Sequence, residues 1–421
     1  MKPETVAAGE DIISNEQVVG EHLIFRSVQD EADVQRFIDL NDAVTHEGPI
    51  TDRLLHHHPA TGYENYFLVL DKLTNQAVSS TCLIPWEIDF DGVRLSVAML
   101  EMVATRPDYR HRGLVRTQVE RFHDLVANQG FDLSVIQGIP YYYRQYGYAY
   151  ALDHTPLTVL TTKGIPAEPT SRYLQRAARL DDIKILVQLY QSAMAFNQLS
   201  VYRSAEYWHY LLKYMDYPVY LIEDTQTGQA VGYMTVYRHG NFHRVLENGT
   251  TSAAVALAGL QSLNETGITE VQVAGPPTNS LVQLARGLSG NLLVADQWLW
   301  RITDVARLLS RLKPVFERRL ANSDWAGLTA QLHLNLYRQA YALKIESGRL
   351  TVESLGFVDA SMGADGGDFC IPPEAFIRLL FGYRRLTELR DAWPDIRIKP
   401  ASRNLLAILF PPLEAHILMP Y

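Results

Sequence analysis

The sequence predicts a multidomain protein of the mixed α/β (α+β) class. A chain of 421 residues is longer than one hydrophobic core usually organises. At about 100 to 200 residues per domain, this length predicts two to four domains. A strand, helix and hairpin pattern occurs twice, and a strand–helix–strand crossover follows its first copy. With 47% hydrophobic and 20% charged residues, the composition is typical of a folded globular protein.

The repeated pattern is clearest in two predicted hairpins. Residues 67–78 read FLVLDKLTNQAV and residues 220–231 read YLIEDTQTGQAV, which are identical at six of twelve positions. Each is a strand, a turn containing Asn75 or Gly228, and a second strand. A short strand and an amphipathic helix with an acidic start precede each hairpin, in LIFRSVQDEADVQRFIDL and YLQRAARLDDIKILVQLY. The copies lie about 150 residues apart, and we predict two related α/β units.

Domain boundaries follow from these copies. After a polar segment over 1–20, the first unit covers 21–163 and the second 170–304, with a polar, Pro-bearing linker over 161–172. The remaining segment, 305–421, matches neither copy. It is predicted to contain a helical stretch in VARLLSRLKPVFERRL, two strands joined at Ser347-Gly348, a loop in GADGGDF and a helix in IPPEAFIRLLFG.

Charge and composition exclude several classes of function. With 38 Lys and Arg against 47 Asp and Glu, the net charge of -9 argues against a nucleic acid or an anionic membrane as the main partner. It suits either simple solubility or a cationic substrate. No segment approaches the roughly 20 apolar residues of a membrane span, and we expect a cytoplasmic protein. Cys82 and Cys370 alone provide neither a disulfide framework nor a clustered-thiol metal site.

Cationic residues gather at one turn, which we call the cationic turn (residues 106–113). It follows a predicted strand over 93–105 and precedes a helix that ends at Gly130 and a further strand over 131–138. A helix N-terminus favours an anion, and Arg110 and Arg112 placed there oppose the helix dipole. Either an anionic ligand or salt bridges to neighbouring carboxylates would offset that opposition. Neither a GxxxxGK[ST] nor a GxGxxG motif is present here.

The turn and the helix start resemble motif A of the GNAT acyl-CoA transferases, whose Q/R-x-x-G-x-G/A loop wraps the pyrophosphate of acetyl-CoA. This chain reads Arg110-His111-Arg112-Gly113-Leu114-Val115, and Val115 departs from the motif. With the duplication and the C-terminal stretches AFIRLLFGYRRLTEL and LLAILFPP, the chain resembles the enhanced-intracellular-survival (Eis-like) family. That resemblance implies two tandem GNAT domains followed by a sterol-carrier-protein-like α+β domain.

The resemblance also implies a donor site for acetyl-CoA, without a metal. Backbone groups of Val103, Ala104 and Thr105 would bond the pantetheine arm like an added strand. The remaining donor-site residues implied are Arg110, His111, Arg112, Gly113, Leu114, Val115 and Arg116 around the pyrophosphate, with Gly138 and Ile139 after the next strand. The second unit has no arginine before its helix, in ENGTTSAAVALAGLQSL, and we expect it to bind no CoA.

A tyrosine is the expected general acid. A phenol near pKa 10 can protonate a thiolate of pKa near 8.5 at a penalty of only about 2 kcal/mol. Spacing alone leaves Tyr141, Tyr142, Tyr143 and Tyr146 open, or simply packed. The resemblance, through a Tyr-x-x-aromatic-Gly-Tyr pattern, selects Tyr143.

The chain end is apolar, FPPLEAHILMPY, which predicts that it docks on the protein. The resemblance implies that the terminal carboxylate, here that of Tyr421, is the catalytic base; docking into a core is the alternative. His56, His57 and His58 are adjacent and cannot converge on one metal ion, so we expect an exposed loop. Trp298 and Trp300 alternate on a strand and are expected in a core or interface.

The sequence thus predicts an acetyl-CoA-dependent N-acetyltransferase that transfers acetyl directly to a primary amine. Expected acceptors are a small cationic molecule, such as an aminoglycoside or polyamine, or a lysine, with no nucleic acid or membrane partner. The resemblance implies a homo-oligomer, a trimer or hexamer. The alternative is a protein that binds a lipid or apolar ligand and retains only an acyl-CoA-sensing domain.

Overall fold

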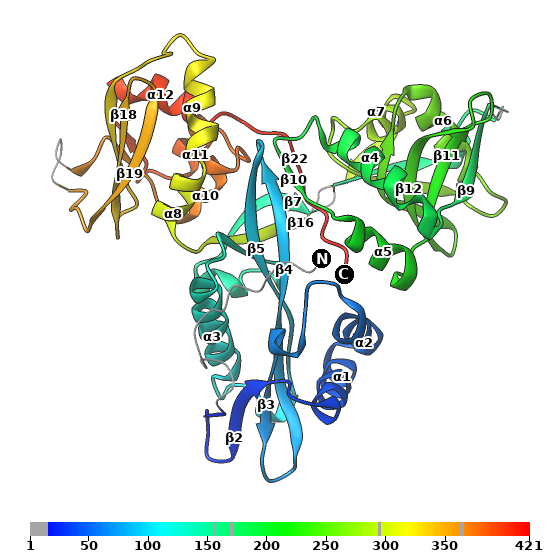
Figure 1. The fold of residues 1–421 in the computed structure, drawn as a ribbon, viewed down its shortest axis with the longest axis horizontal. Coiled ribbons are helices and arrows are strands. Elements are labelled where there is room, and N and C mark those ends of the chain that lie inside the picture. The colour runs from blue at the N-terminus through cyan, green and yellow to red at the C-terminus, as the bar shows by residue number, and fades with distance from the viewer. Residues whose placement is uncertain (1–15, 155, 168–171, 294–295, 362–365) are drawn as a thin grey trace. The chain divides into compact units, whose positions relative to one another are not determined.

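The computed structural model describes residues 16–154, 156–167, 172–293, 296–361 and 366–421 (Figure 1). The chain forms two compact units. The first comprises Met1–Pro85, Ala98–Gly130 and Tyr421, and the second comprises Trp86–Val97 and Phe131–Pro420. Most of the predicted polar segment over 1–20, and part of the predicted loop GADGGDF, lie outside the described residues. Helices and three β-sheets confirm the mixed α/β class.

The first unit is built on antiparallel strands that follow one another in the sheet. Their order is β1 (Gln17–Val18), β2 (Leu23–Ser27), β3 (Tyr66–Asp71), β4 (Gln76–Phe90) and β5 (Val93–Thr105). Strands β4 and β5 each continue into the second unit. Helices α1 (Glu31–Thr45) and α2 (Gly48–His57) lie on one side of these strands, and α3 (Leu114–Asn128) lies on the other (Figure 1).

The elements predicted around the cationic turn are confirmed. Strand β5 has the predicted bounds, and α3 begins directly after Gly113 and ends before Gly130, which has φ +73°. Its buried face carries Val119, Phe122 and Val126, which is the helical spacing read from the sequence.

Both predicted hairpins are also confirmed. Strand β3 turns into β4, and β11 (Val219–Asp224) turns into β12 (Gln229–His239). Asn75 and Gly228 both adopt left-handed backbone, with φ of +56° and +68°. The pairs that close the turns, Asp71↔Gln76 and Asp224↔Gln229, occupy matching positions.

The second unit contains a complete seven-stranded sheet, of order β15-β8-β14-β13-β12-β11-β9. Its further strands are β8 (Leu157–Thr161), β9 (Tyr173–Ala177), β13 (Phe242–Thr250), β14 (Glu270–Ala274) and β15 (Asn291–Leu293). Its helices are α4 (Ile183–Met194), α5 (Ala205–Tyr214), α6 (Ala253–Ser262) and α7 (Ser280–Gly287). The core between sheet and helices includes Val245, Leu260 and Val271, all fully buried. We call residues 157–293 the second lobe.

Two strands lie across the predicted domain boundaries. Strand β8 precedes position 163, yet it pairs with β14 and β15 of the second lobe. Strand β16 (Asp296–Ile302) precedes position 304, yet it pairs with β6 (Leu133–Ile136) and β7 (Ala149–His154). A domain boundary at 163 therefore separates β8 from its partners β14 and β15, and one at 304 places β16 in a different domain from its partners β6 and β7.

The C-terminal part of the second unit carries a five-stranded sheet of order β19-β18-β17-β20-β21. These strands are β17 (Ala330–Asn335), β18 (Ala340–Glu346), β19 (Arg349–Gly356), β20 (Phe369–Cys370) and β21 (Arg397–Ile398). The accompanying helices are α8 (Val305–Arg311), α9 (Lys313–Ala321), α10 (Pro373–Leu380), α11 (Leu386–Ala392) and α12 (Arg403–Leu409). The prediction of two strands joined at Ser347-Gly348 was one strand short, because Tyr337, at φ +66°, turns the chain between β17 and β18.

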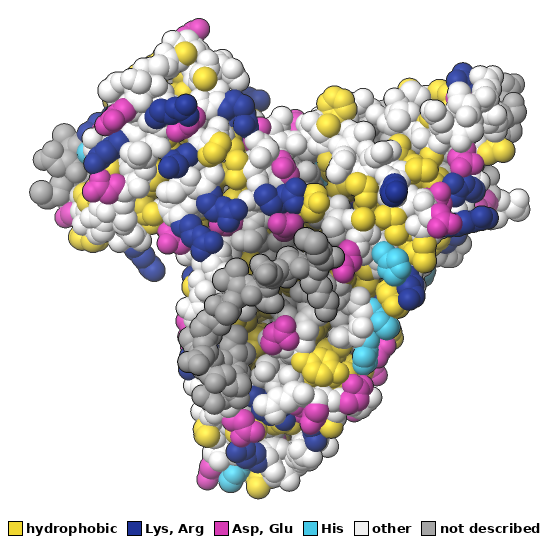
Figure 2. Space-filling model, viewed as in Figure 1, with side chains coloured by type: hydrophobic (Ala, Val, Ile, Leu, Met, Phe, Trp, Pro, Cys, Tyr) yellow, Lys and Arg dark blue, Asp and Glu magenta, His cyan; other side chains and the backbone are white. Residues whose placement is uncertain are grey.

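Surface charge and hydropathy agree with the composition. On the face drawn in Figure 2, Lys and Arg side chains lie among Asp and Glu side chains. Among the described residues, no helix is long and apolar enough to cross a membrane. Trp298 and Trp300 are 1% and 0% exposed, which confirms their predicted place in a core. Cys82 and Cys370 are both buried free thiols.

Candidate active site

The cationic turn leads into a helix N-terminus that no side chain of the described residues caps. A 3-10 turn over Pro107–Tyr109 follows β5, and His111 and Gly113 then adopt positive φ of +63° and +80°. Gly113 is the N-cap residue of α3, and a Cβ atom built on it would meet nothing within 4 Å. Among the described residues no side chain accepts from the first backbone N–H groups of α3, and such groups at a helix start can bind an anion.

Two arginines of this turn, Arg110 and Arg112, donate to backbone carbonyls, whereas Arg106 forms an ion pair with Asp108 at 3.6 Å. Arg112 Nη2 donates to the carbonyl of Asp108 at 2.9 Å, and its guanidinium lies 4.6 Å from the ring centre of Tyr109. Arg110 Nε donates to the carbonyl of Thr105 at 3.3 Å. Within the described part of the chain, neither Arg110 nor Arg112 forms an ion pair with a carboxylate. Salt bridges thus do not explain the two positive charges.

The corresponding helix of the second lobe, α6, is capped by the side chain of its N-cap residue. Ser252 is the N-cap of α6, and its Oγ accepts from the backbone N–H of Val255 at 3.3 Å. No arginine lies in the segment ENGTT directly before it. The two copies therefore differ at the feature that an anion would use.

Strand β5 is irregular just before Val103. Met102 has φ +53°, a left-handed conformation that interrupts the regular strand while its side chain stays buried. Hydroxyl groups of β4 satisfy the carbonyls around this point. Ser80 Oγ donates to Met102 O and Ser79 Oγ donates to Ala104 O, each at 2.9 Å. The feature of the sequence that accompanies this irregularity is the run of hydroxyl residues in the buried strand β4.

The terminal residue Tyr421 lies with the first unit. Arg53 Nη2 donates to the terminal carbonyl oxygen of Tyr421 at 2.9 Å. A guanidinium at this distance favours the ionised carboxylate and fixes its position. Burial, the neighbouring Glu101 and Cys82, and a hydrogen bond to Glu101 raise the pKa of the Tyr421 phenol well above its usual value, so the phenol stays protonated. The predicted docking of the chain end is confirmed.

Three charged residues at this end were not found from the sequence. Arg53 lies on α2, Glu101 on β5, and Glu47 at the N-cap of α2; Glu101 and Glu47 both act electrostatically on the Tyr421 phenol. None belongs to a recognisable motif. Only the fold brings these carboxylates to the chain end.

The other predicted residues belong to the second unit. Gly138 and Ile139 follow β6, and Tyr143 lies in a 3-10 turn over Tyr142–Tyr146. Tyr143 is 5% exposed, and its ring packs so closely on Gly138 that a Cβ there would lie 2.1 Å from Cδ2. Tyr141, by contrast, is 73% exposed. The phenol of Tyr143 is therefore held more firmly than that of Tyr141.

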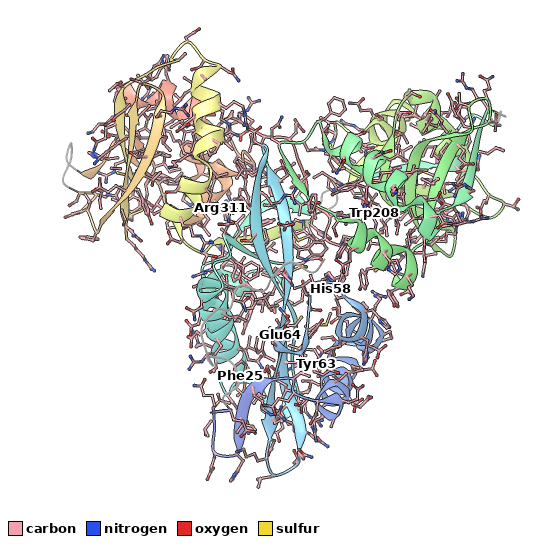
Figure 3. The ribbon with its side chains drawn as sticks, in the orientation of Figure 1. Phe25, His58, Tyr63, Glu64, Trp208 and Arg311 are labelled. Carbon is pink, nitrogen blue, oxygen red and sulfur yellow. The ribbon has the colours of Figure 1, made fainter. Side chains whose placement is uncertain are left out.

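The predicted exposed histidine loop is wrong. His56 and His57 form the last turn of α2, and His58 is its C-cap residue, only 5% exposed (Figure 3). The backbone N–H of Ala60 donates to His58 Nδ1 at 3.3 Å, and burial lowers the pKa of His58 to about 4. Among the described residues, no group of three or more His, Cys, Asp or Glu could hold a metal ion.

Comparison with protein families decides the class of the first copy. Residues 25–151 match the model of the acetyltransferase (GNAT) domain. The chain carries a GNAT acetyltransferase domain. Residues 25–151 are therefore a GNAT acetyltransferase domain, as the resemblance of the cationic turn to motif A implied. No curated protein sequence matches the chain significantly.

Solved structures extend the likeness to nearly the whole chain. A probable N-acyltransferase of Enterococcus faecalis V583 has a TM-score of 0.72 at 16% identity, over 95% of this GNAT protein and 100% of that one. Eis1 from Mycobacterium abscessus has a TM-score of 0.64 at 15% identity, over 94% and 100%. Saccharomyces cerevisiae N-myristoyltransferase with bound myristoyl-CoA has a TM-score of 0.50 at 9% identity, over 71% and 89%. The Eis-like fold is thereby confirmed.

Proposed function

We propose that this GNAT protein transfers acetyl from acetyl-CoA directly to a primary amine of a small cationic molecule or of lysine. One observation carries the proposal: in the GNAT domain, α3 begins uncapped, beside two arginines that have no carboxylate partner among the described residues. A helix start of this kind fits a pyrophosphate. The related fold of yeast N-myristoyltransferase was solved with an acyl-CoA.

On the donor side, His111 to Arg116, with Arg110, would bind the pyrophosphate. Backbone groups of Val103, Ala104 and Thr105 at the end of β5 would bond the pantetheine arm and polarise the thioester carbonyl. Acetyl-CoA supplies the activated acetyl group. Gly138 and Ile139 complete the predicted donor set.

On the acceptor side, the proposal assigns the base to the terminal carboxylate of Tyr421. The hydrogen bond from Arg53 keeps this carboxylate in one place and ionised, ready to accept a proton from the amine. The same bond weakens the carboxylate as a base. Glu47 and Glu101 act electrostatically on the phenol of Tyr421 and so add negative charge at this end of the chain. Such a group of carboxylates also favours a cationic acceptor.

The proposed acid is Tyr143, which would donate its phenolic proton to the departing thiolate of CoA. Its burial and its packing on Gly138 hold the phenol in one orientation. Transfer then needs one base, one acid and one set of strand amides.

For residues 305–421 we propose a sterol-carrier-protein-like domain within a trimeric or hexameric assembly. The five-stranded sheet and its helices support the first part of this proposal. The assembly follows from the family resemblance alone, and sedimentation of the full chain tests it.

The direct test of the function is thiol release. Acetyl-CoA is mixed with the protein and a panel of amines, and free CoA is followed with a thiol reagent. We expect release that depends on a cationic primary amine and yields the acetylated amine. Binding of CoA without release in the presence of any amine would instead favour the sensing and ligand-binding alternative.

A prediction about the chain end tests the base. Deleting Tyr421 removes the carboxylate held by Arg53, and we expect kcat to fall about 100-fold or more, the size typical of a lost general base. Tyr421→Phe keeps the carboxylate and loses only the phenol, so its kcat should stay within a few-fold of wild type. Equal loss in both variants would show that the carboxylate is not the base.

A further inference from the structure

The chain's last residues are bound by the second lobe, which lacks the cationic turn. Strand β22 (Ala415–His416) pairs in parallel with β10 (Leu199–Val201), and the two strands lie side by side in Figure 1. The backbone N–H of Leu199 donates to Glu414 O at 3.2 Å, just before β22. We call residues 414–420 the tail, and its first three residues are therefore fixed in register on β10.

Beyond β22, three side chains of the second unit donate to backbone carbonyls of the tail. Trp298 Nε1 donates to Ile417 O at 3.4 Å, and Arg203 Nη2 donates to Leu418 O at 3.1 Å. The Tyr207 hydroxyl donates to Pro420 O, one residue before the chain ends. These bonds hold the tail up to the residue that precedes Tyr421.

Arg203 is the most deeply buried of these donors. Its side chain is 1% exposed and forms an ion pair with Glu247, which is 2% exposed. Its guanidinium lies 4.7 Å from the ring centre of Tyr190 and 5.4 Å from that of Trp208, which Figure 3 labels. A buried ion pair adds little to stability, but it gives a fixed direction to the remaining N–H groups. Here that direction is Leu418 O.

Glu247 is the counterpart of Glu101 in the duplicated sequence. Strand β5 ends in LEMVAT and β13 leads into LENGTT, which aligns the two glutamates. Glu101 interacts with Tyr421, and Glu247 holds the arginine that binds Leu418 O. In each copy, the glutamate at this aligned position interacts with the last residues of the chain, Glu101 with Tyr421 and Glu247 through Arg203.

From these contacts we propose that Arg203, oriented by Glu247, is a positioning residue for the terminal carboxylate of Tyr421, so that the second lobe serves catalysis by fixing the chain end. The inference rests on the proposed role of that carboxylate. It gives the second copy a function that needs no CoA. Arg203 touches neither reactant and acts only through the tail.

The test replaces the buried pair by apolar residues, in Arg203→Met/Glu247→Met, so that no charge is left buried alone. Hydrogen exchange of the amides over 414–419 and thiol-release kinetics are measured on the full chain. We expect faster exchange in the tail and a kcat about 10- to 100-fold lower, with the KM for acetyl-CoA unchanged. The matched control is Arg238→Met/Glu265→Met, an ion pair of the same lobe whose partners do not contact the tail.

The same substitution in a chain lacking Tyr421 separates the two proposals. If Arg203 acts through the carboxylate, the pair replacement lowers kcat no further there. An equal further loss, or unchanged exchange in the tail, overturns the inference. Full activity of the Tyr421 deletion alone overturns the proposed base instead, and the exchange measurement still reports whether Arg203 holds the tail.

A milder variant covers the case in which the double replacement does not fold. Tyr207→Phe removes only the hydroxyl bonded to Pro420 O, and Tyr337→Phe removes a matched hydroxyl bonded to Asp395 O, away from the tail. We expect faster exchange in the tail and a lower kcat for the first variant only. Identical behaviour of the two variants would contradict a tail held by the second lobe.

Discussion

His58 shows how a single buried residue ties the stability of the first unit to pH. It caps α2 with its ring inside the protein, where burial lowers its pKa to about 4. An unfolded chain has an ordinary histidine pKa near 6.5, so below that pH the unfolded state takes up a proton that the folded state resists. The folded state is thus destabilised progressively from about pH 6.5 down to about pH 4.

We predict that His58→Leu removes this pH dependence. For wild type, about 3 kcal/mol of unfolding free energy should be lost to His58 between pH 7 and pH 4, because burial lowers its pKa to about 4. Urea unfolding at several pH values measures it. His57→Leu, which changes an exposed neighbour, should keep the wild-type slope. Parallel curves for wild type and His58→Leu would mean that His58 titrates normally.

Tyr143 is the residue-scale test of the proposed acid. Its phenol is buried and fixed on Gly138, whereas Tyr141 is exposed. We predict that Tyr143→Phe lowers kcat about 100-fold with little change in acetyl-CoA affinity, because only proton donation is lost. Steady-state kinetics and CoA titration check both numbers. A similar loss in Tyr141→Phe would argue against Tyr143 as the acid.

At the scale of elements, the two copies share more than their hairpins. Arg26 of β2 pairs with Asp33 at the start of α1, and Arg176 of β9 pairs with Asp182 at the start of α4. Both aspartates also accept a backbone N–H, from Gln29 and Arg179, at 3.1 and 2.8 Å. Because each strand-to-helix connection is closed by the same bonds, the copies keep the same entry into their first helix.

The two copies differ at the N-termini of α3 and α6, since Ser252 caps α6 whereas α3 follows the cationic turn. We predict that Arg110→Ala and Arg112→Ala each raise the KM for acetyl-CoA about tenfold, since each removes one charge-assisted contact to the pyrophosphate. The effect should shrink at high salt. Ser252→Ala in α6 should lower stability by about 1 kcal/mol and leave this KM unchanged. Unchanged KM in both arginine variants would remove the cationic turn from the donor site.

At the scale of the whole molecule, strands β8 and β16 decide which segments can fold. Residues 156–293 contain all seven strands of the sheet β15-β8-β14-β13-β12-β11-β9 and its apolar core. Residues 170–304, the range predicted from the sequence, lack β8 and include β16, whose partners β6 and β7 lie elsewhere in the chain. The second fragment therefore leaves sheet edges without partners.

We predict that the fragment 156–293 is folded and soluble, and that 170–304 aggregates. Circular dichroism and size-exclusion chromatography of the two fragments check this, since they differ mainly in β8 and β16. A well-folded 170–304 fragment would show that β8 is dispensable for the lobe.

The sequence by itself determined the class of fold, the two hairpins, β5 and α3, because periodicity, turn residues and helix ends are local properties. It also supplied the cationic turn, whose chemistry lies within a few consecutive residues. Only the tertiary structure decided which sheets β8 and β16 join, that His58 is buried, and that Arg53, Glu101 and Arg203 interact with residues near the chain end. These contacts join residues that lie far apart in the sequence, and a local sequence pattern does not predict which distant residues meet.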